Sequence, residues 1–456
     1  MGHRLNRRQF VSRSMGVLGS LAMASQMRPL RAQEADDYRA LVLLFQFGGV
    51  DCHDVVIPYE VGGYNEYARI RSSLLTTYEG ARARDNLLQL GSSGSSAAYA
   101  LPPELSAFKT LFDEGTAALV GNVGPLIEPT DRASVFSGAV ALPPRLFSHN
   151  DQQSVWQSSA PEGAPAGWGG VFADTLVQQG IGAPSSFNTL TTARDSLFVT
   201  GYDSIPYAAS SGGIELDLST VVRDEAGGSL ANVYQLLQQQ GRSAPHILTR
   251  DLAQTTVDAF AANAEYLSII ADAPDLGVTF QEDRLGSQLE LAAQIIASRQ
   301  EFGVRRQIFL VGAYGYDTHS AQGSILPELH GQLNDGVAAF SDAMKNLGLF
   351  DQVTLATASD FGRTLAVNGD GTDHGWGGHQ FVVGGAVNGG TLYGDIPPPA
   401  FEHDQDAGAG RLIPTISVEQ YAASLGRWLG LDDSSLEMAL PNWLNFSSQP
   451  LAGLMR

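Results

Sequence analysis

The strongest constraint on the fold comes from short runs of apolar residues without polar alternation. The first covers residues 40–47 and stops at Gly48-Gly49. A strand that is apolar on both faces is buried on both sides, as in a parallel sheet covered by helices. Similar runs occupy 117–120, 307–311, 353–358 and 381–383. These runs predict the strands of an α/β protein.

Helical periodicity separates some of these runs. Apolar residues at 326, 329, 333, 337, 340 and 344 step by three and four, as do those at 285, 289, 292 and 296. Ser417 and Gln420 form a capping-box pair before a third apolar pattern. The order strand, helix, strand from 307 to 358 predicts a βαβ unit. The segment from about 185 to 250 lacks such patterns and is interpreted as a cap or insertion on one domain spanning 33–456.

Residues 1–32 have the composition of a targeting segment. They contain six Arg and no Asp, Glu or Lys, and residues 6–11 read Asn-Arg-Arg-Gln-Phe-Val, a twin-arginine form. The weakly apolar stretch 14–25 is shorter than the roughly 20 residues that span a bilayer. We therefore expect a signal peptide read by the twin-arginine translocase, and a periplasmic or secreted protein without a stable membrane span. The alternative is a cytosolic protein with a basic N-terminus.

Composition excludes several classes of function. The chain carries 27 Lys+Arg against 48 Asp+Glu, a formal charge of −21, which disfavours nucleic acid as a partner. The single Cys excludes a disulfide framework and a multi-Cys zinc or iron–sulfur site. The sequence has no dinucleotide-binding glycine motif and no haem-attachment motif, which disfavours an oxidoreductase.

Acidic residues follow three of the predicted strands. Asp51, Asp317 and Asp360 come shortly after the runs 40–47, 307–311 and 353–358. The carboxyl ends of parallel strands lie at one edge of a sheet, where ligands bind. Three carboxylates there repel one another unless a cation neutralises them. Each Asp alone could instead cap a helix or form a turn.

Histidines accompany these carboxylates. His319 is two residues beyond Asp317, so in an extended segment both side chains point the same way. His374 and His379 share a glycine-rich segment before the run 381–383. Asp and His without thiolates suit zinc, manganese, magnesium or calcium. The sequence therefore indicates a site for one or two divalent ions.

Four further residues are candidates for catalysis. Ser148 and His149 lie in a polar segment that reads as substrate contact or as a turn before a helix. Cys52, next to Asp51, is either a thiolate nucleophile or an inert buried thiol. Arg363 either clamps an anionic group or pairs with a structural carboxylate.

Several motifs together resemble the bacterial DUF1501 family. The family's Gly-Gly-x-Asp, Ser-His-x-Asp-Gln and Phe-Asp-Thr-His motifs match segments 48–51, 148–152 and 316–319. Its Ser-Glu-Phe-Gly-Arg-Thr motif matches 359–364, with Asp360 in place of Glu, and its Asp-His-Gly matches 373–375. Its closing Gly-Gly and Tyr-Gly match 384–385 and 393–394, so the matches run from the leader to about residue 395.

This family is similar to the alkaline phosphatase and sulfatase superfamily. The resemblance implies a three-layer α/β/α sandwich with a mostly parallel sheet and inserted loops. It also implies a metal centre in which Asp51, Asp317, His319 and Asp360 match ligands, with His374 or His379 as a late His. Phe361 replaces a superfamily His, and the sulfatase nucleophile motif is missing. Either one ion binds, or His149 or His379 completes a second site, or catalysis has been lost.

Two functions follow from these residues. The first is an exported metal-dependent hydrolase of phosphate or sulfate esters, with Arg363 holding ester oxygens and Ser148, Cys52 or water as nucleophile. The second is a non-catalytic protein of a cell-surface complex that binds a metal or a glycan. Trp156, Trp168 and Trp376 would then stack on sugars, unless they belong to the core.

Overall fold

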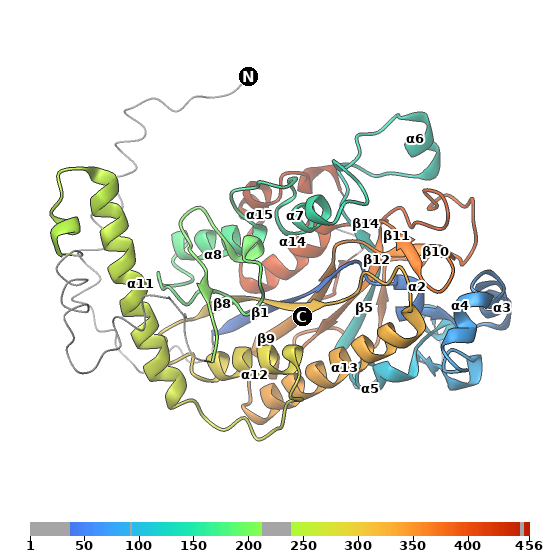
Figure 1. Ribbon diagram of the computed structural model, residues 1–456, viewed down its shortest axis with the longest axis horizontal. Coiled ribbons are helices and arrows are strands. Elements are labelled where there is room, and N and C mark those ends of the chain that lie inside the picture. The colour runs from blue at the N-terminus through green and yellow to red at the C-terminus, as the bar shows by residue number, and fades with distance from the viewer. Residues whose placement is uncertain (1–36, 92–93, 212–238, 447–450) are drawn as a thin grey trace. The chain divides into compact units, whose positions relative to one another are not determined.

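The computed structural model describes residues 37–91, 94–211, 239–446 and 451–456 (Figure 1). The predicted leader, residues 1–32, lies outside these residues, as does 212–238 of the predicted insertion. By its internal contacts the chain divides into Met1–Tyr38 and Arg39–Arg456. All helices and strands of the described residues lie in the second unit.

A nine-stranded sheet forms the centre of this unit. Its order is β13-β5-β12-β9-β1-β8-β6-β7, and β14 also pairs with β5. The bounds are β1 (Arg39–Phe47), β5 (Ala117–Gly124), β6 (Thr189–Thr191), β7 (Tyr207–Ala208), β8 (Arg306–Tyr314), β9 (Val353–Ser359), β12 (Gly378–Val383), β13 (Leu392–Tyr393) and β14 (Ile416–Ser417). Only β12 runs against its neighbours β5 and β9; the other pairings are parallel. The five strands predicted from apolar runs are confirmed.

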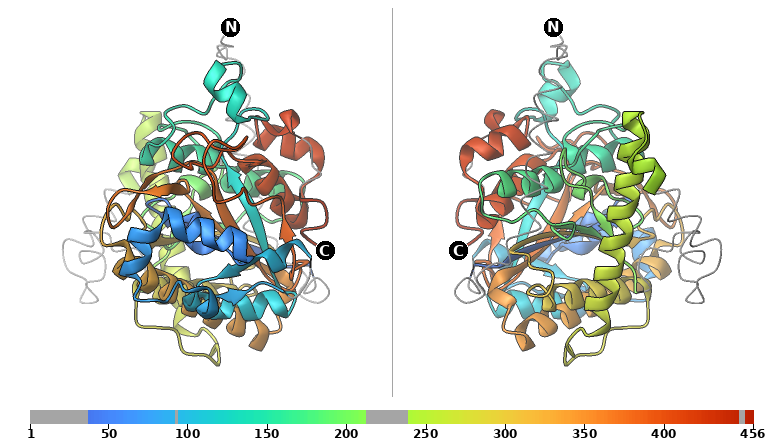
Figure 2. Two further views of the ribbon diagram at one scale, coloured as in Figure 1. Left: turned by 90° about the vertical axis from the view of Figure 1, so that its right-hand side faces the viewer. Right: turned by 90° about the vertical axis from the view of Figure 1, so that its left-hand side faces the viewer.

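Helices cover both faces of the sheet, as the labelled view and the end-on views show (Figures 1 and 2). One layer contains α5 (Ser106–Asp113), α12 (Arg284–Ala297) and α13 (Gln322–Asn346). The opposite layer contains α7 (His149–Ser158), α8 (Trp168–Gln178), α14 (Val418–Leu429) and α15 (Asp433–Ala439). The predicted α/β fold, an α/β/α sandwich with a mostly parallel sheet, is therefore confirmed.

The central strand β1 shows why the apolar runs become buried strands. Residues 40–45 have no measurable exposure, because alternate side chains enter the two helical layers. Leu41, Leu43 and Phe45 belong to the same core cluster as residues of α14 and α8. Trp156 and Trp168 also lie in this cluster, and Trp376 is buried in a smaller one. The three tryptophans therefore belong to the core and do not form a surface for sugars.

The predicted unit from 307 to 358 corresponds to β8, α13 and β9. Its two strands are parallel, but β1 lies between them and pairs with both. The capping box of Ser417 and Gln420 is present at the start of α14. Part of the predicted insertion extends the central sheet, because β6 and β7 add to the free side of β8.

Shorter elements surround the edge where β1, β8 and β9 end. They are α2 (Cys52–Val55), α3 (Val61–Ile70), α4 (Ser72–Thr77), α6 (Arg132–Ser137), β10 (Arg363–Val367) and β11 (Thr372–His374), with a small sheet of β2 (Ile57–Pro58), β3 (Leu88–Gln89) and β4 (Tyr99–Leu101). At the opposite edge, α11 (Ile247–Ala271) meets β7 where the Tyr207 hydroxyl donates to Asn263. None of the described helices has the length and apolar character needed to cross a membrane.

Candidate metal centre

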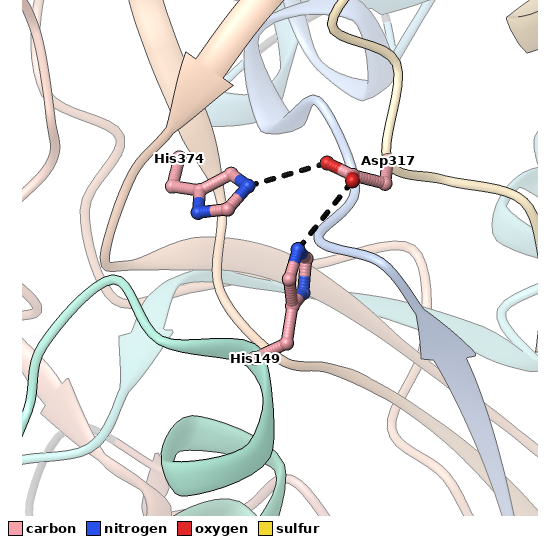
Figure 3. Close-up of side chains that lie close together, drawn as sticks. All are labelled: His149, Asp317 and His374. Carbon is pink, nitrogen blue, oxygen red and sulfur yellow. Dashed lines mark hydrogen bonds and ion pairs between the residues drawn. The ribbon is translucent and has the colours of Figure 1, made fainter.

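Three side chains from separate parts of the chain converge beside the ends of β1, β8 and β9 (Figure 3). His149 is the first residue of α7, Asp317 follows β8, and His374 ends β11. Each offers one possible ligand atom, and these atoms all lie within 4.8 Å of one another. We call these three residues the metal group.

Hydrogen bonding fixes which nitrogen of His149 faces the group. Its Nδ1 is 2.6 Å from Oδ2 of Asp360, a carboxylate that can only accept, so Nδ1 carries the proton. Nε2 then has a free lone pair in the neutral ring. This atom is buried, has no hydrogen-bond partner, and lies 3.6 Å from Oδ2 of Asp317. A metal-binding imidazole has this pattern, with one nitrogen donating to a carboxylate and the other facing the ion.

His374 repeats the pattern with a backbone acceptor. Its Nδ1 donates to the carbonyl oxygen of Phe147 at 2.8 Å. Nε2 therefore presents a lone pair to Oδ1 of Asp317, 3.2 Å away. Phe147 itself has a positive φ of 72°, an uncommon conformation for a non-glycine residue, which turns its carbonyl towards the imidazole. Both histidines thus aim an acceptor nitrogen at the same carboxylate.

Arg363 orients that carboxylate. Its Nη1 donates to Oδ1 of Asp317 at 3.0 Å and to the Gly48 carbonyl at 3.0 Å. Its Nε and Nη2 donate to Thr372, and the side chain is fully buried. The guanidinium is therefore committed to protein oxygens. Of the two roles considered for Arg363, the structure shows pairing with a carboxylate.

The pKa shifts follow from these contacts. The hydrogen bond to Asp360 raises the pKa of His149, while burial lowers the pKa of His374. Burial works to raise the pKa of Asp317, but the hydrogen bond and charge of Arg363 outweigh it and lower the pKa. At neutral pH the group therefore contains an ionised carboxylate.

His319 and Asp373 lie at the exposed side of the metal group. Nε2 of His319 is 2.8 Å from Nε2 of His374 and 3.1 Å from Oδ1 of Asp317. Since the His374 nitrogen is an acceptor, the His319 nitrogen must donate to it. Nδ1 of His319 is 3.4 Å from Oδ1 of Asp373. His319 is thus close enough to join the group, with 43% of its side chain exposed.

Asp51 lies apart from the metal group. Its carboxylate is fully buried, caps α2, and pairs with both terminal nitrogens of Arg71 at 2.8 and 3.0 Å. Gln322 donates to it at 2.6 Å. Burial works to raise the pKa of Asp51, but Arg71 lowers it. The structure therefore shows Asp51 as half of a buried ion pair.

Asp360, matched by resemblance to a metal ligand, also has its oxygens occupied. Its Oδ1 accepts from the Gly48 backbone at 3.2 Å. Its Oδ2 accepts from His149 and from Nε2 of Gln153, the latter at 2.9 Å. In this arrangement Asp360 orients the candidate ligand His149.

The other candidates lie outside the metal group. Cys52 is buried, and desolvation raises the pKa of its thiol to about 12, whereas a nucleophile needs a lowered pKa. His379 is buried with a pKa lowered to about 3, and its Nδ1 accepts from the Asn122 backbone at 3.0 Å. The Ser148 hydroxyl donates to Asp151 at 2.9 Å.

Sequence reasoning missed several contributors. The Phe147 carbonyl, the Gln153 amide and the Phe361 ring all touch the histidines of the group or their partner Asp360. Arg71, the partner of Asp51, was also missed. A Gln one helical turn beyond His149 could have suggested a second donor on the same face of α7. No sequence signal marks a backbone carbonyl as a partner.

The residues present fit a divalent transition metal. Two atoms bonded to one zinc ion at about 2.1 Å each are at most about 4.2 Å apart. The 3.2 and 3.6 Å separations of the two imidazoles from Asp317 lie within that limit, and no pair in the group is more than 4.8 Å apart. Two imidazoles with one carboxylate favour zinc or a similar ion over magnesium or calcium, which prefer oxygen ligands. The side chains of His149, Asp317 and His374 are 28%, 45% and 24% exposed, so a further ligand can reach the ion from solvent.

Comparisons of the chain with curated proteins and with solved structures give little sequence similarity. Among curated proteins, none matches it. The sulfatase PsFucS1 from Pseudoalteromonas sp. shares 10% identity at a TM-score of 0.37, covering 99% of this chain and 76% of that one. Ps i-CgsB, solved in complex with k-i-k-neocarrahexaose, shares 10% identity at a TM-score of 0.33, covering 90% and 77%.

A family profile matches most of the chain in sequence. The profile described as "Protein of unknown function (DUF1501)" matches residues 38–440. This range includes the metal group, the Asp51 ion pair and every strand of the central sheet. The chain belongs to the DUF1501 family.

Proposed function

We propose that this protein is an exported hydrolase of phosphate or sulfate esters that depends on a divalent metal at His149, Asp317 and His374. One observation carries the proposal. Nε2 of His149 is buried without a hydrogen-bond partner, 3.6 Å from the Asp317 carboxylate, while Nδ1 is held by a second carboxylate. Burying an acceptor without a partner is costly, and a cation between the lone pairs removes that cost.

The chain's own residues supply orientation. Asp360 fixes the ring of His149, the Phe147 carbonyl fixes that of His374, and Arg363 holds Oδ1 of Asp317. When bound, a divalent ion lowers the pKa of a water molecule and neutralises ester oxygens. Water is the nucleophile that fits best, because the Cys52 thiol is buried and protonated and the Ser148 hydroxyl is bonded to Asp151.

Charge around the site is consistent with this role. Three carboxyl groups, of Asp317, Asp360 and Asp373, lie at the site, against the guanidinium groups of Arg363 and of Arg411, which donates to the His374 carbonyl. Acidic groups outnumber basic ones there, as suits a divalent cation. Without the ion, an anionic ester would be repelled. We therefore expect both metal binding and turnover to depend on the same three residues.

Export remains part of the proposal. The twin-arginine form of residues 6–11 supports transport to the periplasm or beyond by the translocase that carries folded proteins. A protein exported in its folded state can acquire its metal before it crosses the membrane. Replacing Arg7 and Arg8 with Lys and fractionating the cells tests this route, and unchanged export would contradict it.

A second candidate function is binding of a metal or glycan without catalysis. The hydrogen bonding of Arg363 favours this second function. The guanidinium expected to hold an ester is buried and already donates to Asp317, Gly48 and Thr372. An ester would then have to be held by the ion alone. This candidate predicts a bound metal, no turnover, and retention on a glycan array.

The two functions are separated by one assay of the purified full chain. Aryl phosphates and aryl sulfates are offered with and without chelator, and zinc or manganese is then restored. Hydrolysis that chelator abolishes, metal restores and His149→Ala removes supports the hydrolase, with His246→Ala at an exposed His as the control. Metal binding without turnover on any ester supports the second function, and turnover insensitive to chelator contradicts the first.

A further inference from the structure

Gln322 is a buried amide between the Asp51–Arg71 ion pair and the segments that carry Asp317 and His374. It is the first residue of α13 and has no measurable exposure. Ala321, before it, adopts a left-handed conformation with φ of 53°, and its backbone nitrogen donates to Asp370. A non-glycine residue in this region is strained, so the turn that aims Gln322 inward is stabilised by its surroundings.

All four hydrogen-bonding positions of the Gln322 amide are used. Nε2 donates to Oδ2 of Asp51 at 2.6 Å and to the Tyr78 hydroxyl at 3.1 Å. Oε1 accepts from the hydroxyls of Thr372 at 2.8 Å and Thr318 at 3.1 Å. The orientation of the amide is determined, because the carboxylate of Asp51 can only face the NH₂ group.

The two threonines belong to the segments that carry the metal group. Thr318 directly follows Asp317, and Thr372 is two residues before His374. The Thr372 backbone nitrogen also donates to the Thr318 carbonyl at 3.1 Å. Thr372 accepts from Nε of Arg363 through its hydroxyl at 3.0 Å, and Arg363 holds Asp317. One amide oxygen therefore joins both segments.

We propose that Gln322 is a positioning residue for the metal group, linking the Asp51–Arg71 ion pair to the segments that present Asp317 and His374. The proposal rests on the proposed function for the identity of the ion. Its physical basis is that replacing the amide removes the common acceptor of Thr318 and Thr372. The two segments then lose their shared alignment, although no ligand has been changed. A residue hydrogen-bonded directly to a ligand typically affects metal affinity by 10- to 100-fold. Gln322 acts one residue further out, through Thr318 and Thr372, so we expect an effect at the lower end of that range.

The test compares Gln322→Leu with Gln380→Leu in the full chain. Gln380 is an equally buried amide, bonded to the Thr357 hydroxyl at 2.8 Å, and it lies on β12. We expect Gln322→Leu to weaken zinc binding by roughly 10-fold in chelator competition, and Gln380→Leu by less than about twofold. Urea unfolding of both variants shows whether their losses of stability are comparable. Thr318→Val and Thr357→Val form a milder matched pair should a leucine variant fail to fold.

A second readout needs no metal. In metal-free protein with labelled histidines, the NMR signals of the His319 and His374 rings should shift in Gln322→Leu and Thr318→Val and stay in place in the control variants. Absence of zinc binding by the unaltered protein overturns the proposed function, and these ring signals then decide the role of Gln322. Unshifted signals overturn that role. So does zinc affinity that is unchanged, or equally reduced in both leucine variants.

Discussion

Two regions of this protein hold carboxylates beside the same sheet edge, and their neighbours differ. In the buried ion-pair layer, Asp51 pairs with Arg71 and Asp54 with Arg82, all nearly without exposure. In the metal group, Asp317 faces the lone pairs of two imidazoles and is half-exposed. A carboxylate at the end of a buried strand thus becomes an ion-pair member or a candidate ligand according to which side chains reach it. Position in the sheet does not decide this.

The largest effect should come from breaking the ion-pair layer. Arg71→Met leaves the buried charge of Asp51 without its partner, so we expect a loss of about 3–5 kcal/mol in the free energy of unfolding. Arg69→Met, two residues away, is the control, because Arg69 is exposed and pairs with the surface residue Glu66. Urea unfolding measures both. Equal effects would show that the layer is no more important than a surface pair.

Substitutions in the metal group should mainly lower the affinity for zinc, with smaller effects on the free energy of unfolding than Arg71→Met. His374→Ala removes one candidate ligand and Asp317→Asn removes the negative charge of another, and we expect each to weaken zinc binding by more than about 100-fold, beyond the range for supporting residues. In metal-free His374→Ala the free energy of unfolding should change little, because that side chain is partly exposed. In Asp317→Asn it should fall, because the buried Arg363 loses the charge of its carboxylate partner. Isothermal titration gives the affinities, with Arg71→Met as the complementary case. A ligand variant that unfolds the protein yet keeps zinc would reverse the comparison.

Acid should destabilise the ion-pair layer through its buried histidine. Burial lowers the pKa of His330, which lies 3.9 Å from Asp54, to about 4. In the unfolded chain this imidazole titrates near pH 6.5, so below that pH the unfolded chain binds one more proton there than the folded protein does. His330 therefore leaves the free energy of unfolding unchanged above about pH 6.5. As the pH falls from 6.5 towards 4, it lowers that free energy by up to about 1.4 kcal/mol per pH unit.

Replacement of this histidine tests the assignment. His330→Leu should flatten the fall in the free energy of unfolding between pH 6.5 and 4, as measured in urea across that range. His246→Leu, at an exposed position, is the control and should leave the slope unchanged. His53 and His379, whose pKa values burial lowers to about 4 and about 3, add to the slope in the same sense, and His149, whose pKa is raised, opposes it. An unaltered slope in His330→Leu would contradict the burial of a neutral ring.

The smallest effect is expected at Cys52. Its thiol is buried near the Gly377 carbonyl and has a pKa raised to about 12, so it is not a thiolate at neutral pH. Cys52→Ala should leave zinc affinity and ester hydrolysis unchanged. Iodoacetamide at pH 7.5 should modify the protein in urea and not in its folded state. Rapid alkylation of the folded protein would return Cys52 to the list of nucleophiles.

The parts of the fold predictable from sequence are those with local signals. Uninterrupted apolar runs identified β1, β5, β8, β9 and β12 because a strand buried on both faces leaves no polar alternation. The runs could not show that β1 lies between β8 and β9, since pairing order depends on contacts between distant segments. The gathering of Asp317, His319 and Asp360 at one edge followed from strand direction.

The roles of individual side chains were less predictable. Asp51 and Asp317 follow similar strands, yet the partner of Asp51 comes from the turn between α3 and α4, whose direction no local pattern specifies. His374 and His379 share one glycine-rich segment, but β12 turns His379 towards β5, where it accepts from Asn122. Side-chain direction is set by packing, so residue type and spacing alone do not distinguish a ligand from a buried structural residue.

Metal content tests the central claim most directly. The full chain, purified without added metal or chelator, and the double variant His149→Ala/His374→Ala are compared by elemental analysis and by zinc titration. The metal group predicts one divalent ion per chain in the unaltered protein, zinc or a similar transition metal, and none in the variant at equal folded fraction. No bound ion in the unaltered protein even after titration with zinc, or the same content in both proteins, would contradict it.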